Sequence, residues 1–325
     1  MKKLRNLFAV LLLLFVFVTG FTEFKWNQGA VQEEASGTAM WCALMRALSN
    51  KESRPSLNCG DYLAEIFLPD DQKELLKTQE GRDWARRRQP AGMYAFMIAR
   101  TFYYDSAVKQ ALQDGFQQVV ILGTGYDTRP YRLQKESANA KFYEIDTMPT
   151  LQHKKEMFQK AKISIPKNVI FAPIDFNKDS FEDVFSKAGY DKTKKTIFIW
   201  EGVTYYISDQ AIETTLKFVK TNSAVGSLLC FDYEMEIWND MDIAEINRLV
   251  ELGYFWRNHF PNEPSAWKID YTEVNSFLSK RGFKVEEHLK AKEEGIQRKF
   301  FSFQDSREIG HVPVIFGIVK ASVAP

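Results

Sequence analysis

From residue 117 onward, short apolar runs alternate along the chain with stretches that mix apolar and charged residues. Uninterrupted apolar runs that end at glycine or an acid are typical of strands buried on both faces of a parallel sheet. The mixed stretches have the pattern of amphipathic helices. Strands that alternate with helices predict a doubly wound α/β sheet. The predicted strands are 118–122, 142–145, 169–172, 196–199 and 227–231, and the predicted helices are 151–162, 181–188 and 209–220.

The segment before the first strand, residues 30–115, predicts helices. Residues 38–48 are apolar with few interruptions. Pro90 predicts a second helix from residue 91 to about residue 112, because proline is favoured in the first helical turn. The sheet is therefore expected to be preceded by a helical N-terminal part.

The C-terminal part predicts two further strands, 282–285 and 314–319, with no obvious helix between them. We expect them to form an antiparallel pair at one edge of a mostly parallel seven-stranded sheet. Residues 233–280 are rich in aromatic and acidic side chains and predict a helical insertion on the substrate side. We thus expect one domain over 30–325, which divides into helices at 30–115, a ligand-binding core at 117–232, the insertion at 233–280 and terminal strands at 281–325.

The first 25 residues form a separate unit. Lys2, Lys3 and Arg5 precede an apolar run from Leu7 to Val18. A basic flank before a short apolar run is typical of an export signal, and the run approaches the length of a membrane span if extended. The positive-inside rule would carry the rest of the chain across the membrane. We expect residues 1–25 to be a membrane anchor or a cleaved signal, with a cytoplasmic catalytic domain as the alternative.

Composition excludes several classes of protein. The 325 residues include 43 basic and 42 acidic side chains, for a net charge of +1. This balance argues against a nucleic-acid partner, because such binding depends on neutralising phosphates. The cysteines, Cys42, Cys59 and Cys230, are too few for a disulfide framework and fit no zinc spacing. With only four histidines along the chain, we expect no metal site.

Glycine or acidic residues follow each of the first five predicted strands. Ligands of doubly wound sheets bind beyond the carboxyl ends of the strands, so these residues are candidates for one shared site. Asp146 follows Gly123 by 23 residues, about the spacing at which an acid reaches the ribose hydroxyls of a bound nucleoside. The residues after the five strands are Gly123-Thr124-Gly125-Tyr126-Asp127-Thr128, Glu144 and Asp146, Asp175-Phe176, Glu201-Gly202, and Asp232.

The charge at these strand ends distinguishes between possible ligands. Thr128 stands where the dinucleotide-binding fingerprint has a small residue. Pyrophosphate prefers a helix N-terminus without neighbouring acids, whereas this loop carries Asp127 and faces further acids. The pattern favours a ligand with hydroxyls, an amine and a cationic centre. An NAD(P)-dependent oxidoreductase and a membrane-tethered binding protein without catalysis are the alternatives.

The same residues carry a family resemblance. The stretch 119–133, with Gly123-Thr124-Gly125-Tyr126-Asp127-Thr128-Arg129 at its centre, resembles the first motif of the leucine carboxyl methyltransferase family. Residues 142–146, 174–176, 200–207 and 281–285 resemble its later motifs, so that the resemblance covers about residues 35–320. It implies a class I methyltransferase-like Rossmann fold and S-adenosylmethionine as the cofactor, since the family includes a bacterial branch of O-methyltransferases that use it.

The resemblance also implies roles for residues at the nucleoside end of the cofactor. Gly123 would lie against the cofactor, and Gly125 would shape the turn. Asp146 would hold the ribose hydroxyls. Asp175 would accept from the adenine amine, and Phe176 would pack on the adenine face.

At the methionine end, the resemblance implies that Glu201 faces the amine and that Arg100 pairs with the carboxylate. Arg46 is a candidate for a second cation there. As alternatives, Arg100 pairs with nearby acids and Glu144 faces a basic side chain. No catalytic acid–base pair is apparent, and a carboxylate acceptor needs none because it is already ionised at neutral pH. We therefore expect methylation of a carboxylate or other acidic oxygen, on a small molecule or a protein.

Overall fold

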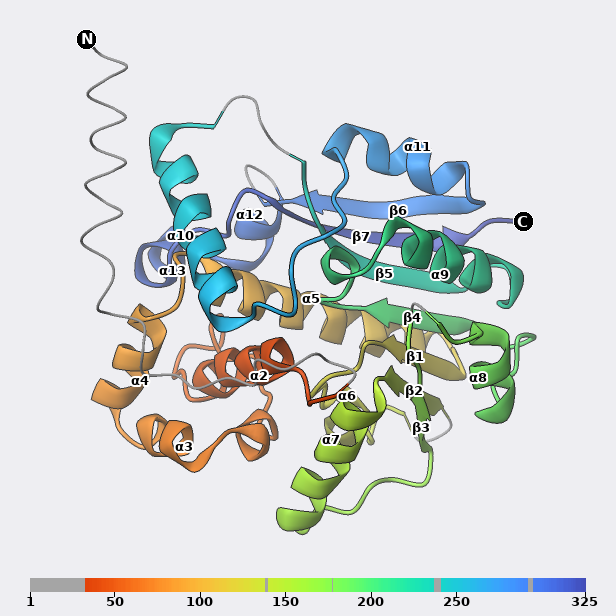
Figure 1. The fold of residues 1–325 in the computed structure, drawn as a ribbon, viewed down its shortest axis with the longest axis horizontal. Coiled ribbons are helices and arrows are strands. Elements are labelled where there is room, and N and C mark those ends of the chain that lie inside the picture. Colours follow the sequence, from red (N-terminus) through yellow and green to blue (C-terminus); the bar gives the residue numbers. More distant parts are fainter. Residues whose placement is uncertain (1–32, 138–139, 177, 237–240, 292–294) are drawn as a thin grey trace.

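The computed structural model describes residues 33–137, 140–176, 178–236, 241–291 and 295–325 (Figure 1). The predicted anchor or export signal, residues 1–25, lies outside these ranges. Within them, no helix combines the length and the apolar character that a membrane span needs.

A single seven-stranded sheet forms the centre of the fold, in the order β3-β2-β1-β4-β5-β7-β6. Strands β1 to β5 are parallel, and β7 runs antiparallel to both β5 and β6. This confirms the predicted doubly wound, mostly parallel sheet and the antiparallel pair at its edge. The strands are β1 Gln118–Leu122, β2 Lys141–Asp146, β3 Val169–Pro173, β4 Thr196–Trp200, β5 Leu228–Glu234, β6 Phe283–Lys290 and β7 Phe316–Val323.

Helices precede, connect and cover the strands (Figure 1). Each predicted helix is present, with ends shifted by a few residues. The α-helices are α2 Gly37–Asn50, α3 Asp70–Leu76, α4 Gln79–Arg87, α5 Met93–Gln113, α6 Arg129–Arg132, α7 Met148–Lys160, α8 Phe181–Lys187, α9 Asp209–Thr221, α10 Ile243–His259, α11 Val274–Ser279, α12 Ile296–Phe300 and α13 Phe303–Ile309. The 3₁₀-helices are η1 Ala64–Phe67, η2 Thr204–Tyr206 and η3 Tyr271–Glu273.

The connection between β6 and β7 differs from the sequence prediction. It contains two helices, α12 and α13, where we expected none. Both span fewer than two full turns, which is too short for a recognisable apolar period. The start of α13 is nonetheless defined, because Ser302 and Asp305 form a reciprocal capping box there.

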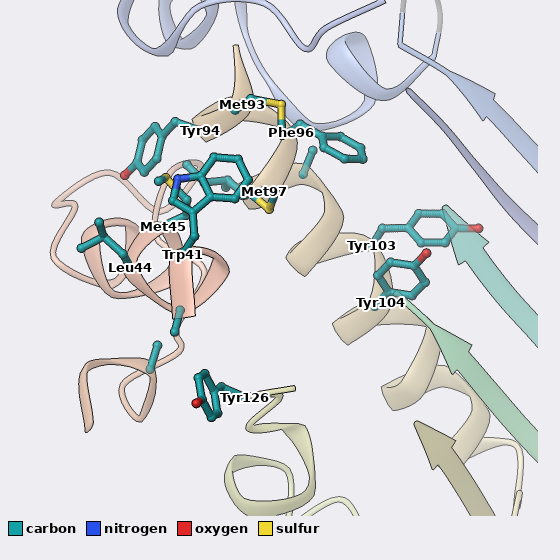
Figure 2. Packing of buried hydrophobic residues seen from close by; sticks show 14 of the residues in the cluster. Trp41, Leu44, Met45, Met93, Tyr94, Phe96, Met97, Tyr103, Tyr104 and Tyr126 are labelled. Atoms are coloured by element: carbon teal, nitrogen blue, oxygen red, sulfur yellow. The ribbon is translucent and has the colours of Figure 1, made fainter. Parts of the chain in front are cut away.

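Helix α5 packs against α2 and β4 and is buried on nearly every side. It begins at Met93 rather than beside Pro90, because Gly92 adopts a φ of 85° and interrupts the helical backbone. A Cβ atom at Gly92 would lie 2.0 Å from the carbonyl oxygen of His311, so only glycine fits there. Figure 2 shows Trp41 of α2 clustered with Met93 and Met97 of α5.

The insertion is held over α2 by one carboxylate. Glu263, in the loop that follows α10, accepts hydrogen bonds from the backbone N–H of Thr38 at 3.2 Å and from its hydroxyl at 2.5 Å. The hydroxyl of Ser36 donates to the same carboxylate at 3.1 Å. An acid is favourable at this position because the first N–H groups of a helix have no partner within the helix. Helix α10 thereby becomes a wall opposite the sheet edge.

Candidate active site

A cavity of about 1050 Å³ opens at the carboxyl ends of β1, β2 and β4, between the sheet and the helices α2, α5 and α10. Most of the predicted binding residues line it. They are Arg46, Arg100, Gly123, Gly125, Asp146, Phe176 and Glu201. Asp175 is not among the lining residues, and its carboxylate lies 3.0 Å from the Lys178 ammonium.

The loop after β1 turns tightly because two of its glycines have positive φ angles. Gly123 (φ 69°) packs so closely that a Cβ atom would lie 2.3 Å from a methyl group of Val203. Gly125 (φ 45°) donates its N–H to Oδ2 of Asp146 at 2.6 Å, and Thr147 donates its N–H to Oδ1 at 2.7 Å. Burial raises the pKa of Asp146 despite these donors. The acid therefore fixes the loop and borders the cavity at once.

A buried ion pair supports this loop from below. The Lys154 ammonium lies 2.6 Å from Oε1 of Glu144 and 3.1 Å from the hydroxyl of Thr124. The Tyr131 hydroxyl donates to the other oxygen of Glu144 at 2.8 Å. Lys154 and Glu144 are both completely buried. The alternative in which Glu144 faces a basic side chain is thus what the structure shows.

Arg100 connects the cavity to the interior. Its Nε donates to Glu201 at 3.0 Å, and its Nη1 donates to the Tyr205 hydroxyl at 2.9 Å and to Asp232 at 3.1 Å. Nη2 has only a contact of 3.4 Å to the sulfur of Cys42 among the described residues. A guanidinium has five N–H groups and a thiol is a weak acceptor, so Nη2 remains available to a ligand carboxylate. The pairing with acids and the role implied by the family are therefore compatible.

Asp232 positions Arg100, a role that sequence reasoning missed. Its carboxylate is fully buried and also accepts hydrogen bonds from the N–H of Gly202 at 2.7 Å and the hydroxyl of Tyr104 at 3.1 Å. The sequence pattern placed Asp232 among the strand-end candidates for one ligand site without naming a partner, and the structure places it inside β5. A polar residue that ends an apolar strand beside the ligand edge was the available signal.

Arg129 is a second residue that sequence reasoning left without a role. Its guanidinium lies 2.6 Å from Glu201, 2.5 Å from Asp127 and 2.7 Å from Asp105. Glu201 is consequently held from both sides, by Arg100 through one oxygen and by Arg129 through the other. The signal was present in the Asp-Thr-Arg part of the first motif.

Acids and bases alternate through the interior beside the cavity. We call this set the charge chain, and it comprises Asp232, Arg100, Glu201, Arg129, Asp127, Asp105, Arg132, Asp61 and Arg46. Five carboxylates against four guanidiniums leave an excess of one negative charge. Asp146 adds a further acid on the cavity side. A binding partner with cationic groups is favoured by this excess.

We predict that Asp105 sets the acid limit of stability. Burial alone would raise its pKa, but Arg129 and Arg132 outweigh burial and hold the pKa below its ordinary range. The contribution of Asp105 to the free energy of unfolding is then complete above about pH 4, the ordinary pKa of an unfolded Asp. It is lost as the pH falls through the pKa of Asp105 in the folded protein, which is lower. Asp105→Asn should cost about 3 kcal/mol at neutral pH and flatten the acid limb of a stability–pH curve measured by urea unfolding. Asp114→Asn, a change at an exposed position, is the control. If the two variants lose stability equally steeply as the pH falls, this assignment is contradicted.

We predict that Gly202→Ala weakens cofactor binding. Gly202 has a φ of 72°, and a Cβ atom there would lie 3.1 Å from Nη1 of Arg100, so the guanidinium must move. Gly189→Ala is the matched control, because Gly189 has a φ of 70° and no atom within 4 Å of the added Cβ. Both variants should lose about 1–2 kcal/mol of stability through backbone strain. Calorimetric titration with S-adenosylhomocysteine should show weaker binding, by about tenfold, in Gly202→Ala alone.

Comparison with known proteins agrees with this geometry. The family model described as leucine carboxyl methyltransferase matches residues 39–220. The chain belongs to the leucine carboxyl methyltransferase family. YktD of Bacillus subtilis, named as an S-adenosyl-L-methionine-dependent methyltransferase, is 28% identical over 83% of this chain and 93% of its own length. A protein of Streptomyces avermitilis named in the same way is 28% identical over 71% of this chain and 80% of its own.

Two solved structures share the fold. A structure from Thermobifida fusca, titled as a methyltransferase, has a TM-score of 0.53 and 14% identity, covering 87% of this chain and 94% of that one. A DUF574 family protein from Streptomyces avermitilis has a TM-score of 0.54 and 13% identity, covering 90% and 99%. The family member described here is thus a methyltransferase with S-adenosylmethionine as its cofactor. The comparisons support neither the oxidoreductase nor the non-catalytic alternative.

The residues at the cavity fit this cofactor. Asp146 keeps lone pairs for ribose hydroxyls, Phe176 offers a ring face beside the same end of the cavity, and Glu201 has lone pairs left for an ammonium. Nη2 of Arg100 can meet a carboxylate. No group of three or more potential metal ligands is gathered anywhere in the described ranges.

Proposed function

We propose that the protein transfers the methyl group of S-adenosylmethionine to a carboxylate or another oxygen that is already ionised. The cofactor supplies an electrophilic methyl group on a sulfonium. As a lone pair of the acceptor oxygen forms the new C–O bond, the S–CH₃ bond breaks and its electron pair stays on sulfur. A carboxylate and a sulfonium therefore give a neutral methyl ester and a neutral thioether, and no proton has to be removed.

The observation that carries this proposal is that the acids at the interior end of the cavity are already held in ion pairs and hydrogen bonds. Burial raises the pKa of the Tyr205 and Tyr206 hydroxyls and of the Cys42 thiol above their ordinary values. These groups stay protonated at neutral pH and are poor general bases. No histidine stands among the described residues that line the cavity. An acceptor that arrives ionised avoids the need for a base.

The acids at the interior end of the cavity are engaged in other bonds, whereas Glu236, which also lines the cavity, is exposed. Glu201 is held by two arginines, and Asp146 by two backbone N–H groups. Asp61 is paired with Arg46 at 2.8 Å. The chain's own contribution is therefore to align two bound reactants, which can supply several kcal/mol of the barrier. Excluding water from the interior end of the cavity strengthens the electrostatic contacts that hold them.

The proposal is tested with S-adenosylmethionine labelled in its methyl group and an extract of the producing cell. We expect labelled product that releases methanol in mild alkali, because methyl esters hydrolyse whereas methyl ethers and methylamines do not. Label that survives alkali would contradict a carboxylate acceptor. Titration with NAD(P)H alongside S-adenosylhomocysteine provides the control for the oxidoreductase alternative.

A further inference from the structure

The cavity is larger than one ligand requires. Ligand sites of about 300–1000 Å³ enclose most of a drug-sized molecule, and this cavity has about 1050 Å³. Its two parts have different linings. The part at the sheet edge holds the glycine loop and the acids described above. The part between α2, η2, α10 and the start of β7, which we call the aromatic part, is lined by Trp41, Met97, Tyr205, Tyr206, Trp256, Phe260 and Phe316.

The rings of the aromatic part form one continuous wall. Trp256 stacks on Tyr206 with centroids 5.7 Å apart and meets Trp41 edge-on at 5.4 Å. Tyr206 continues to Tyr205 at 4.7 Å, and Tyr205 to Phe316 at 6.0 Å. Because Tyr205 also contacts Arg100, the wall begins directly beside the methionine end of the cofactor site.

Three of the four polar side-chain groups of this wall, all except the Tyr206 hydroxyl, are already used inside the protein. The indole N–H of Trp41 donates to Gln89 at 2.7 Å, and that of Trp256 donates to the backbone oxygen of Glu263 at 2.8 Å. The Tyr205 hydroxyl donates to Asp232 at 3.1 Å. A polypeptide brings an N–H and a carbonyl with every residue, and each one buried without a partner costs free energy. The wall is therefore better matched to an apolar body than to a peptide tail.

Helix α10 gives the outer end of the cavity an apolar side, while the exposed Glu236, Arg257 and Lys268 also line the cavity. Ile246 and Val250 of α10 line the cavity and are 41% and 51% exposed. Ile243 lies on the same helix face, three residues earlier, but does not line the cavity. Exposed apolar side chains at the mouth of a site indicate a ligand that covers them.

We propose that the methyl acceptor is an apolar acid of small-molecule size. This inference rests on the proposed function. The ionised oxygen would lie beside Tyr205 and Arg100, at the sulfonium end. The apolar body would pass along the aromatic part and reach solvent between Ile246 and Val250. Substrate preference is then set by the length of the apolar body rather than by a peptide sequence.

The test uses the full chain with labelled S-adenosylmethionine and a series of butanoic, octanoic and dodecanoic acid, beside a synthetic peptide that ends in a free leucine carboxylate. Each buried CH₂ group should raise kcat/KM by about fourfold until the body fills the cavity. Dodecanoic acid should therefore exceed butanoic acid by at least about 100-fold, and the peptide should be the poorer substrate. Equal turnover of the three acids, no turnover of dodecanoic acid, or preferential methylation of the peptide would overturn the inference.

Matched variants locate the apolar body. Ile246→Ser and Val250→Ser should each raise the KM for dodecanoic acid by about threefold to tenfold, while the KM for butanoic acid and the affinity for S-adenosylhomocysteine stay constant. Ile243→Ser is the control, and an equal effect of that variant would place the acid elsewhere. Alkali-stable label from the cell extract would count against a carboxylate acceptor, whereas absence of any methyl transfer would count against the proposed function itself. If the label is released by alkali but kcat/KM does not depend on the length of the acid, only the inference about the acceptor is overturned and the proposed function stands.

Discussion

Lys154→Met should lower the free energy of unfolding by about 3–5 kcal/mol, one of the two largest effects we expect from a single change. Removal of the ammonium leaves the fully buried Glu144 without its cation, and breaking one side of a buried ion pair has a cost of this size. Urea unfolding followed by circular dichroism measures the change. Lys160→Met, an exposed position on the same helix, should change the stability by less than about 0.5 kcal/mol.

A double variant separates the charge from the packing. In Lys154→Met/Glu144→Gln the amide oxygen can still accept from Tyr131 and the amide NH₂ can donate to the Thr124 hydroxyl, which has lost the Lys154 donor, and no unpaired charge is buried. We expect most of the lost stability to return. If the double variant is as unstable as Lys154→Met, the loss comes from packing around the lysine stem and not from the carboxylate.

Asp146→Ala should weaken the binding of S-adenosylhomocysteine by about 100-fold, the other large effect. Hydrogen bonds to a charged acceptor are worth about 1.5–3 kcal/mol, and the variant also removes the acceptor that fixes Gly125 and Thr147. Isothermal titration calorimetry measures the affinity, and thermal unfolding verifies that the variant is folded.

Asp175→Ala is the informative comparison for Asp146→Ala. Asp175 does not line the cavity and lies beside the exposed Lys178, so any contact it makes with the adenine competes with water. We expect a loss of less than about tenfold. Equal losses in the two variants would show that Asp175 turns into the cavity when the cofactor binds.

The framework of the fold was predictable because its strands are continuous apolar runs. Strand β1, for example, is buried at every position, and its pattern has no competing explanation. The glycines and acids that follow such strands could be assigned to one ligand edge for the same reason, because parallel strands bring their carboxyl ends together. Asp146, Glu201 and Gly125 accordingly lie at one cavity.

The rest of the site was not predictable from periodicity. Trp41, Tyr206, Trp256 and Phe316 come from four distant stretches of chain, and an aromatic residue in an apolar stretch indicates only burial. The partners of Arg129 were equally hidden, although the residue itself stands in the first motif, because which carboxylates a buried arginine meets depends on tertiary packing. Contacts between side chains of different helices and strands depend on the tertiary structure, so they leave no local pattern in the sequence.

The position of α2 has a further consequence for how the two ligands bind. Its first turn is tied to the loop after α10 by Glu263, and Ala39 stands only 3.0 Å from where a Cβ atom at Gly125 would be. One rigid helix thus touches both the cofactor loop and the wall of the aromatic part. Occupation of either region should change the free energy of binding at the other, and linkage requires the two effects to be equal. Cofactor and acceptor are then expected to bind cooperatively rather than independently.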